Sequence, residues 1–285
     1  MKLRKDVTLF PEGKRKAFTL SYDDGVIQDK RFIQLLKKYN LKATFNLNSG
    51  TFGQIDHYPH LTVDHVKINK EEVKELYKGF EVAVHTLTHP KLTVIPSGMT
   101  AYEVVADRQA LESLVDYPIR GMAYPFGTYN QKVMDTLADC GIEYSRTVQN
   151  TKKFSLPENF LAWHPTCHHD DIELMELAEK FIQPNPRLGA APYLFYVWGH
   201  TYEFDNNKNW DKIEKFFEKI SGKKDIWYAS NIEIVDYINA VKQLRYSADG
   251  KLIYNPTGQT IWLNILDNDY EIKSGQTVKV KYENC

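Results

Sequence analysis

Apolar positions follow two alternating spacings along most of the chain. Short apolar runs typical of buried strands lie at 17–22, 43–47, 81–85, 119–125, 142–148, 160–164, 193–200 and 226–230. Between them, apolar residues recur at helical spacing over 28–39, 69–79, 100–117, 129–141, 171–182, 209–220 and 231–244. Repeated strand–helix units predict parallel strands with helices outside them, arranged as a barrel or as an open sheet.

Polar side chains follow several of these runs at the point where each run ends. Two aspartates, residues 23–24, follow the first run, and His85 ends the third. Residues 124–126 stand at the end of the fourth run, and His200 ends the run that begins at Tyr193. Because active sites of such folds lie at the carboxyl ends of the strands, we expect these side chains to meet at one mouth.

The pattern changes after about residue 243. Turn signals at Asp249-Gly250, Thr257-Gly258 and Ser274-Gly275 separate short alternating runs. These runs predict three or four antiparallel strands in a segment too short to be a confident independent domain. We therefore expect a barrel domain over residues 1–243 and a small β appendage, residues 244–285, that packs on it.

Two histidines, His85 and His89, are spaced four residues apart. Imidazoles at this spacing can reach one ion if the segment turns helically, although two surface histidines are the simpler interpretation of the pair alone. An aspartate at another strand end adds a third ligand, and three ligands with open positions are typical of a catalytic metal centre. Since Asp23 and Asp24 point in different directions, one can bind the ion while its neighbour accepts a proton from water.

Four short motifs occur in a defined order. They are SYDDG (21–25), HTLTHP (85–90), YPFG (124–127) and WGH (198–200). Together they resemble the motifs of the polysaccharide deacetylases of carbohydrate esterase family 4, which contain the NodB-homology domain. The resemblance covers roughly residues 15–240 and implies a distorted (β/α)7 barrel, in agreement with the strand–helix alternation.

The resemblance also implies roles for individual residues. Asp23 would be the general base and His200 the general acid, while Asp24, His85 and His89 would bind a divalent metal, usually zinc. Oxyanion and substrate positions would be Tyr124, Phe126, Trp163 and Trp198, with the Phe126 backbone N–H beside the oxyanion and Trp163 lining the acetyl pocket. The implied reaction is hydrolysis of an acetamide or acetyl ester on a sugar.

The third motif departs from the family pattern. Ala123 stands where the family has an arginine that orients the base. Arg120 lies at an odd offset along the same strand, so its side chain is expected on the other face. We therefore expect another group to orient Asp23.

The segment FLAWHPTCHHDD, residues 160–171, is rich in metal-ligating residue types. Its candidates for a second metal site are His164, His168, His169, Asp170 and Asp171. A polar loop followed by a helix whose N-terminus is capped by Asp170 is the simpler interpretation.

Composition narrows the set of partners. The 285 residues carry a formal net charge of −1, which gives no indication of a nucleic-acid partner. No apolar stretch approaches the length of a membrane span, and the charged N-terminus lacks the apolar run of a signal peptide. We therefore expect no membrane association and a cytoplasmic location. The three widely spaced cysteines predict no disulfide framework.

These observations favour a metal-dependent hydrolase that removes acetyl groups, most simply N-acetyl groups, from a sugar, oligosaccharide or polysaccharide. One alternative is hydrolysis of a non-sugar amide or cyclic ureide on the same barrel. Another is a catalytically impaired carbohydrate-binding protein, which the absent arginine favours slightly. The sequence leaves the sugar, the acetyl position and the oligomeric state open.

Overall fold

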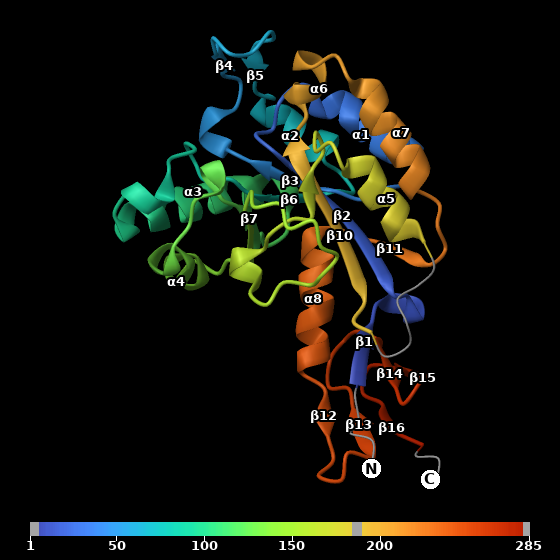
Figure 1. Ribbon diagram of the computed structural model, residues 1–285. Helices are drawn as coiled ribbons and strands as arrows, with labels where there is room; N and C mark the ends of the chain where they lie inside the picture. The colour runs from blue at the N-terminus through green and yellow to red at the C-terminus, as the bar shows by residue number, and fades with distance from the viewer. Residues whose placement is uncertain (1–5, 184–189, 282–285) are drawn as a thin grey trace.

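A curled parallel sheet forms the centre of the computed structural model, which describes residues 6–183 and 190–281 (Figure 1). In these ranges its strands run in the order β8-β7-β6-β3-β2-β10-β9, and β11 pairs with β2. The strands are β2 (Lys16–Asp23), β3 (Thr44–Leu47), β6 (Glu81–Val84), β7 (Gly121–Ala123), β8 (Tyr144–Arg146), β9 (Cys167–His168), β10 (Tyr193–His200) and β11 (Ile226–Tyr228). All their pairings are parallel, and the arrangement confirms the predicted distorted (β/α)7 barrel.

An irregular segment connects the two ends of the curled sheet. The run 160–164 was expected to be a strand, but it begins with a 3₁₀ turn and contributes only a parallel bridge between Trp163 and Arg146 of β8. Further along, the Thr166 N–H donates to the Tyr196 carbonyl of β10. The segment after β8 therefore contacts both β8 and β10 and closes the gap between them. Arg146, at the end of β8, lies near the mouth of the barrel.

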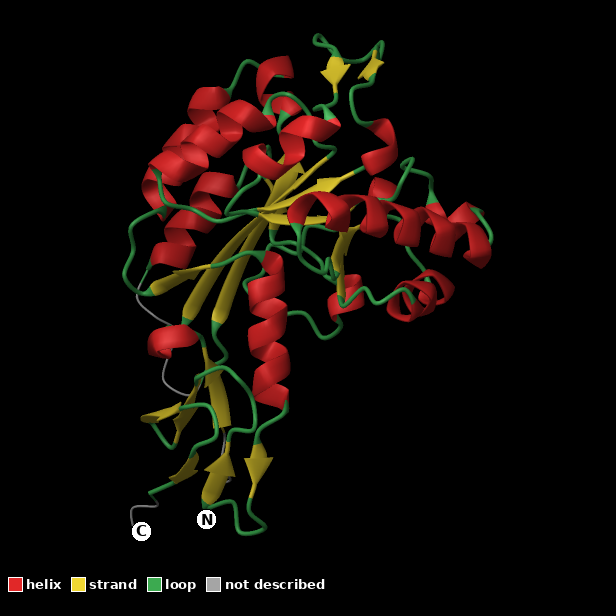
Figure 2. Ribbon diagram, turned by 180° about the vertical axis from the view of Figure 1, so that it is seen from behind, coloured by secondary structure: helices red, strands yellow, loops and turns green. Residues whose placement is uncertain are grey.

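Helices surround the sheet (Figure 2). They are α1 (Asp29–Lys38), α2 (Val73–Leu76), α3 (Ser97–Val115), α4 (Gln131–Asp139), α5 (Leu174–Ile182), α6 (Tyr202–Asn206), α7 (Trp210–Ile220) and α8 (Asn231–Lys242). Single 3₁₀ turns lie at Pro11–Gly13, Ser49–Thr51, Lys70–Glu72, Leu92–Val94, Pro125–Gly127 and Phe160–Ala162. Among the described helices, none combines the length and the apolar character that a bilayer crossing requires.

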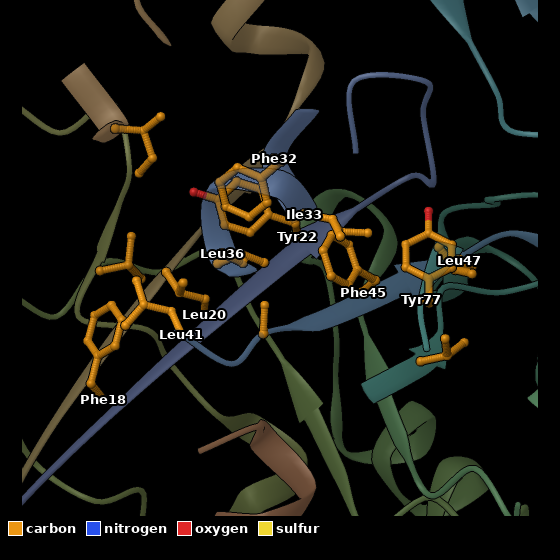
Figure 3. Packing of buried hydrophobic residues seen from close by; sticks show 14 of the residues in the cluster. Phe18, Leu20, Tyr22, Phe32, Ile33, Leu36, Leu41, Phe45, Leu47 and Tyr77 are labelled. Carbon is orange, nitrogen blue, oxygen red and sulfur yellow. The ribbon is translucent and has the colours of Figure 1, made fainter. Parts of the chain in front are cut away.

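The main core lies between the sheet and its helices (Figure 3). All eight residues of β2 are buried because both faces of this central strand are covered. Tyr22 of β2 packs on Phe32 of α1 with a ring-centroid distance of 4.1 Å. Helical spacing places Leu36 one turn after Phe32, so the apolar stripe of α1 rests on the strand that ends at the two aspartates.

The C-terminal strands lie at the amino ends of the barrel strands, away from the mouth (Figure 1). One antiparallel sheet contains β1 (Asp6–Leu9), β14 (Ile261–Ile265) and β15 (Asn268–Ile272). The other contains β12 (Arg245–Tyr246), β13 (Leu252–Tyr254) and β16 (Thr277–Lys279). Five described strands therefore follow residue 243, where three or four were expected, and one of the two sheets also takes β1 from the N-terminus.

A small hairpin projects beyond the carboxyl ends of the strands (Figures 1 and 2). It consists of β4 (Ile55–Asp56) and β5 (His65–Val66), which pair antiparallel. The alternation of the sequence did not predict it, because two-residue strands carry no usable periodicity.

Candidate active site

A cleft of about 830 Å³ opens at the carboxyl ends of the strands. Eight of the nine candidate site residues named from the sequence line it: Asp23, Asp24, His85, His89, Tyr124, Phe126, Trp198 and His200. The ninth, Trp163, does not. Because the eight come from the ends of β2 and β10 and from the segments after β2, β6 and β7, the fold gathers residues that are up to 177 positions apart, from Asp23 to His200.

Asp24, His85 and His89 form a compact group with one ligand atom each, all within 4.8 Å of one another. His85 Nε2 lies 3.9 Å from Asp24 Oδ1. The other ring nitrogen of His85, Nδ1, lies 2.8 Å from the Ala123 carbonyl oxygen and donates to it. This bond fixes the tautomer, so the Nε2 lone pair points towards the group, as in histidine ligands of metal ions.

The segment that carries the two histidines does not turn as a regular helix. Thr86 and His89 both have positive φ, +67° and +60°. Glu103 of α3 accepts hydrogen bonds from the N–H and the hydroxyl of Thr88, at 2.8 and 2.7 Å. Residues 85–89 therefore form a tight turn that is held from outside, and this turn replaces the helical geometry that the spacing suggested.

Protonation states within the group suit a cation. Burial lowers the pKa of His89 to about 3 and also lowers that of His85, so both rings are neutral at neutral pH. Burial alone would raise the pKa of Asp24, but the Lys67 charge and a hydrogen bond from His65 outweigh it and hold that pKa well below its usual range. One ionised carboxylate and two neutral imidazoles are the donor set that zinc and similar divalent ions accept.

Asp23 lies beside this group, with its Oδ2 3.8 Å from His85 Nε2, and it contacts Arg146, which sequence reasoning missed. Its Oδ2 is paired with Arg146 Nη2, and its Oδ1 accepts a hydrogen bond of 2.8 Å from Asn46. Burial raises the pKa of Asp23, but Arg146, His85 and His200 together lower it below the ordinary value. The carboxylate is thus held ionised and in a fixed orientation.

Arg120 takes no part in this contact, as its offset along the strand predicted. Its guanidinium makes a two-pronged ion pair with Asp236, at 2.7 and 2.8 Å, and reaches Glu143 at 3.0 Å. The arginine that contacts Asp23, Arg146, comes instead from the next strand, and its guanidinium carbon lies 4.4 Å from the Trp198 ring centroid. No spacing rule links Arg146 to Asp23, because the two strands meet only through the curl of the barrel.

His200 lies between Asp23 and a second carboxylate. Its Nε2 is 3.9 Å from Asp23 Oδ2, and its Nδ1 is 3.3 Å from Glu203 Oε2. Burial lowers the pKa of His200, but the hydrogen bond and charge of Glu203, together with Asp24 and Asp23, raise it to about 9. His200 is therefore protonated at neutral pH, with Nδ1 directed at Glu203 and Nε2 directed into the cleft.

Two more histidines surround Glu203. His168 Nε2 and His169 Nε2 lie 3.2 and 3.3 Å from the same oxygen, Oε2. The Asp170 N–H donates to His168 Nδ1 at 3.1 Å, so the neutral His168 ring carries its proton on Nε2 and directs it at Glu203. Two groups here have the spacing of a metal site, namely His168, His200 and Glu203, and His168, His169 and Asp170, but the tautomer of His168 favours a proton donor over a metal ligand at its Nε2.

The remaining candidates from this region have structural surroundings. Asp170 does not cap a helix; its carboxylate accepts from Asn207, Asn209 and Lys212. Trp163 is fully buried among aromatic rings, including Tyr196 at a centroid distance of 4.8 Å. The expectation that Trp163 lines the acetyl pocket is therefore not supported, because a long apolar side chain after a 3₁₀ turn packs inward here.

The other aromatic candidates lie at the cleft. Phe126 has a φ of +57°, is 61% exposed, and places its ring centroid 4.7 Å from that of His89. The Tyr124 hydroxyl donates to the Leu161 carbonyl at 2.7 Å, so only part of this side chain faces the cleft. Trp198 donates from Nε1 to Asn150 at 3.0 Å, which fixes the ring beneath Arg146.

Comparisons with known proteins agree with these motifs. Residues 11–145 match the family described as polysaccharide deacetylase, which confirms the resemblance over that part of the chain. No match was found among the curated proteins.

Solved structures of low sequence identity share the fold. A protein from Mycobacterium smegmatis assigned as a polysaccharide deacetylase is 15% identical, with 83% of this chain and 94% of that chain covered and a TM-score of 0.60. A mutant of a CE4-family pseudoenzyme from Bacillus anthracis, with restored enzymatic activity, is 18% identical, covers 81% and 70% of the two chains, and has a TM-score of 0.50. At these identities the likeness shows the barrel and not the reaction.

Proposed function

Since residues 11–145 match the polysaccharide deacetylases, we propose that this chain is a metal-dependent hydrolase that removes acetyl groups, most simply N-acetyl groups, from a sugar or glycan. The observation that carries the proposal is the division of the two adjacent aspartates. Asp23 Oδ2 is paired with Arg146 and lies 3.8 Å from His85 Nε2, whereas Asp24 forms the three-ligand group with His85 and His89. A base beside a three-ligand group is an arrangement that can activate water to hydrolyse an acetyl bond.

Asp24, His85 and His89 would hold the divalent ion, most simply Zn²⁺. Their ionised and neutral states at neutral pH, and the lone pair fixed on His85 Nε2, support this assignment. When bound, the ion supplies Lewis acidity that acidifies water and polarises a carbonyl.

Asp23 and His200 would divide the proton transfers. Asp23, kept ionised by Arg146, accepts a proton from the attacking water. His200, protonated at neutral pH, donates a proton from Nε2 to the departing nitrogen. The separation of 3.9 Å between His200 Nε2 and Asp23 Oδ2 allows both groups to reach one small reacting centre.

The Phe126 backbone N–H is proposed as the donor to the carbonyl oxygen. The ring of Phe126 lies beside His89, and its left-handed backbone places the turn at the rim of the cleft. Such a fixed donor stabilises the negative charge that develops on the oxygen.

Aromatic side chains at the cleft suit a sugar. Tyr58, Tyr202, Trp198 and Phe126 all line it. The cleft volume of about 830 Å³ lies within the range of about 300–1,000 Å³ that small-molecule sites occupy. Faces of aromatic rings pack on the apolar faces of sugars, so an acetylated sugar or short glycan is the substrate we propose.

Hydrolysis of a non-sugar amide or cyclic ureide would use the same base, ligands and acid, so these residues alone do not distinguish it. The impaired-enzyme alternative depended on the absent arginine. Because Arg146 contacts Asp23, that argument loses its ground.

Metal content followed by acetate release tests the proposal. The purified chain is expected to hold one Zn²⁺ and to release acetate from at least one member of a panel of acetylated sugars. Asp23→Asn is expected to lower the rate by about 10²–10⁴-fold without loss of zinc. A chain that binds metal but releases no acetate from any sugar would favour the amide or ureide reaction. A chain that binds no metal would overturn both hydrolase hypotheses.

A further inference from the structure

The returning strand of the β4–β5 hairpin pairs with the chain that leaves the two aspartates. Val26 and Lys67 form an antiparallel bridge. On either side of it, the Ile27 N–H donates to Val66 and the Ile68 N–H donates to Gly25, both at 2.9 Å. The hairpin is therefore attached directly to the turn that contains Asp24, although 41 positions separate Asp24 from His65.

Asp24 has a φ of +82°, an uncommon value for a residue with a side chain, so its conformation depends on its surroundings. The hairpin supplies three contacts to it, one of which is the ion pair between Lys67 Nζ and Asp24 Oδ1 at 3.4 Å. Lys67 Nζ donates to the Asp24 carbonyl at 2.8 Å, and His65 Nε2 lies 3.2 Å from Asp24 Oδ2. Because an ionised carboxylate only accepts, His65 is the donor of this second bond.

The bond from His65 divides the two oxygens of Asp24. Oδ2 faces His65, whereas Oδ1 lies 3.9 Å from His85 Nε2, within the three-ligand group. His65 is buried, and its other ring nitrogen has no hydrogen-bond partner among the described residues. Among the described residues, Asp24 is therefore the hydrogen-bond partner of this buried imidazole, and the carboxylate of Asp56 lies farther off, 3.9 Å from Nδ1.

We propose that His65 is a positioning residue for the metal centre, which fixes Asp24 so that Oδ1 alone is offered to the ion. The inference rests on the proposed function, since it concerns the same centre. Partners of this kind orient ligating carboxylates, and their loss typically weakens metal binding by about 10–100-fold.

The same imidazole also contacts the substrate side of the cleft. Its ring centroid lies 4.9 Å from that of Tyr202 and 5.6 Å from that of Tyr58, two rings that line the cleft. The hairpin tip is held to α6, where the Thr62 N–H donates to Asn206 at 2.7 Å. The ring that bonds Asp24 is therefore itself packed against tyrosines that line the cleft.

Zinc titration of variants tests the inference. His65→Phe keeps an aromatic ring against Tyr202 but cannot donate to Asp24, and its dissociation constant for Zn²⁺ is expected to rise by about 10–100-fold in competition with a chromogenic chelator. His65→Gln retains a donor and is expected to recover most of the affinity. At saturating zinc, His65→Phe is expected to regain most of its kcat, because the reacting groups are unchanged.

His57→Phe is the matched control, because His57 lies on the same hairpin but is exposed. The hydrogen bond described for its side chain goes to Asp64 and not to Asp24. This control is expected to bind zinc as the wild type does. If His65→Phe does not fold, His65→Leu takes its place in the same titration. If the folded His65 variant binds zinc as tightly as the wild type does, the role of His65 is overturned but the proposed metal centre is not. If the wild-type chain binds no zinc, the proposed metal centre itself is overturned.

Discussion

Two histidine clusters lie at the mouth of this barrel, and they differ in the second hydrogen bond of their rings. In the first, His85 donates from Nδ1 to a carbonyl oxygen, so its Nε2 presents a lone pair to Asp24 and His89. In the second, His168 accepts at Nδ1 from a backbone N–H, so its Nε2 presents a proton to Glu203. Similar residue types therefore present a lone pair in one place and a proton in the other.

Burial and charge increase this difference. His89 has a pKa of about 3 and is neutral, because it is buried beside another imidazole. His200 has a pKa of about 9 because the Glu203 carboxylate lies against it and overcomes the effect of burial. The residue types alone therefore do not distinguish a metal centre from a cluster of proton donors. The hydrogen-bond partner of the second nitrogen of each ring distinguishes them.

Removing one histidine from each cluster should give the largest contrast. His85→Ala is expected to lose bound zinc and to reduce acetate release by more than the about 10–100-fold typical of an outer-shell change, because a ligand itself is lost. His168→Ala is expected to keep one zinc per chain. Metal analysis of the two purified variants checks this, and zinc loss from His168→Ala would show that the second cluster also binds metal.

Arg146→Met should have the next largest effect, because it leaves the Asp23 charge buried without its partner. Breaking such a pair typically costs about 3–5 kcal/mol, measurable by denaturant unfolding. We also expect kcat to fall about 10–100-fold, since the base is no longer oriented. Arg120→Met is the control: it removes a partly exposed ion pair outside the cleft and should leave kcat near the wild-type value.

The sequence predicted the strand–helix alternation and the strand ends because these depend on local periodicity. It also predicted that Arg120 faces away, since that follows from the pleat of one strand. It did not predict Arg146 as the partner of Asp23, because their contact depends on how the sheet curls. Trp163 was misplaced for a related reason: the loop that contains it closes the barrel and turns the ring into the core.

The contacts of the β4–β5 hairpin and of β1 could not be predicted from local sequence patterns either. His65 lies in a segment with no clear period, and its contact with Asp24 exists only once residues 66–68 pair with residues 25–27. Similarly, β1 gives no local sign that it will pair with β14, about 255 residues later. Long-range pairing of short strands is set by the assembled fold.

Glu203→Gln should move the pH profile by a smaller amount. In the proposed reaction His200 acts in its protonated form, so activity is expected to be lost as pH rises through its pKa of about 9. Removing the anionic charge of Glu203 lowers that pKa, and the falling limb of kcat/KM should therefore move to lower pH. Rates measured from pH 6 to 10 at one equivalent of zinc test this, and an unchanged limb would show that another group titrates there.

Gly199→Ala should have the smallest effect and should disturb only the second cluster. A Cβ at this position would lie 2.0 Å from His169 Nδ1, so the buried ring beside Glu203 has to move. Overpacking of this kind typically costs about 1–3 kcal/mol, while the ligand group around Asp24 lies outside the collision. Gly98→Ala is the control, because its Cβ meets no atom within 4 Å. Thermal unfolding together with zinc titration should show a lower Tm and unchanged zinc affinity for Gly199→Ala alone, and weakened zinc binding would mean that the two clusters are not independent.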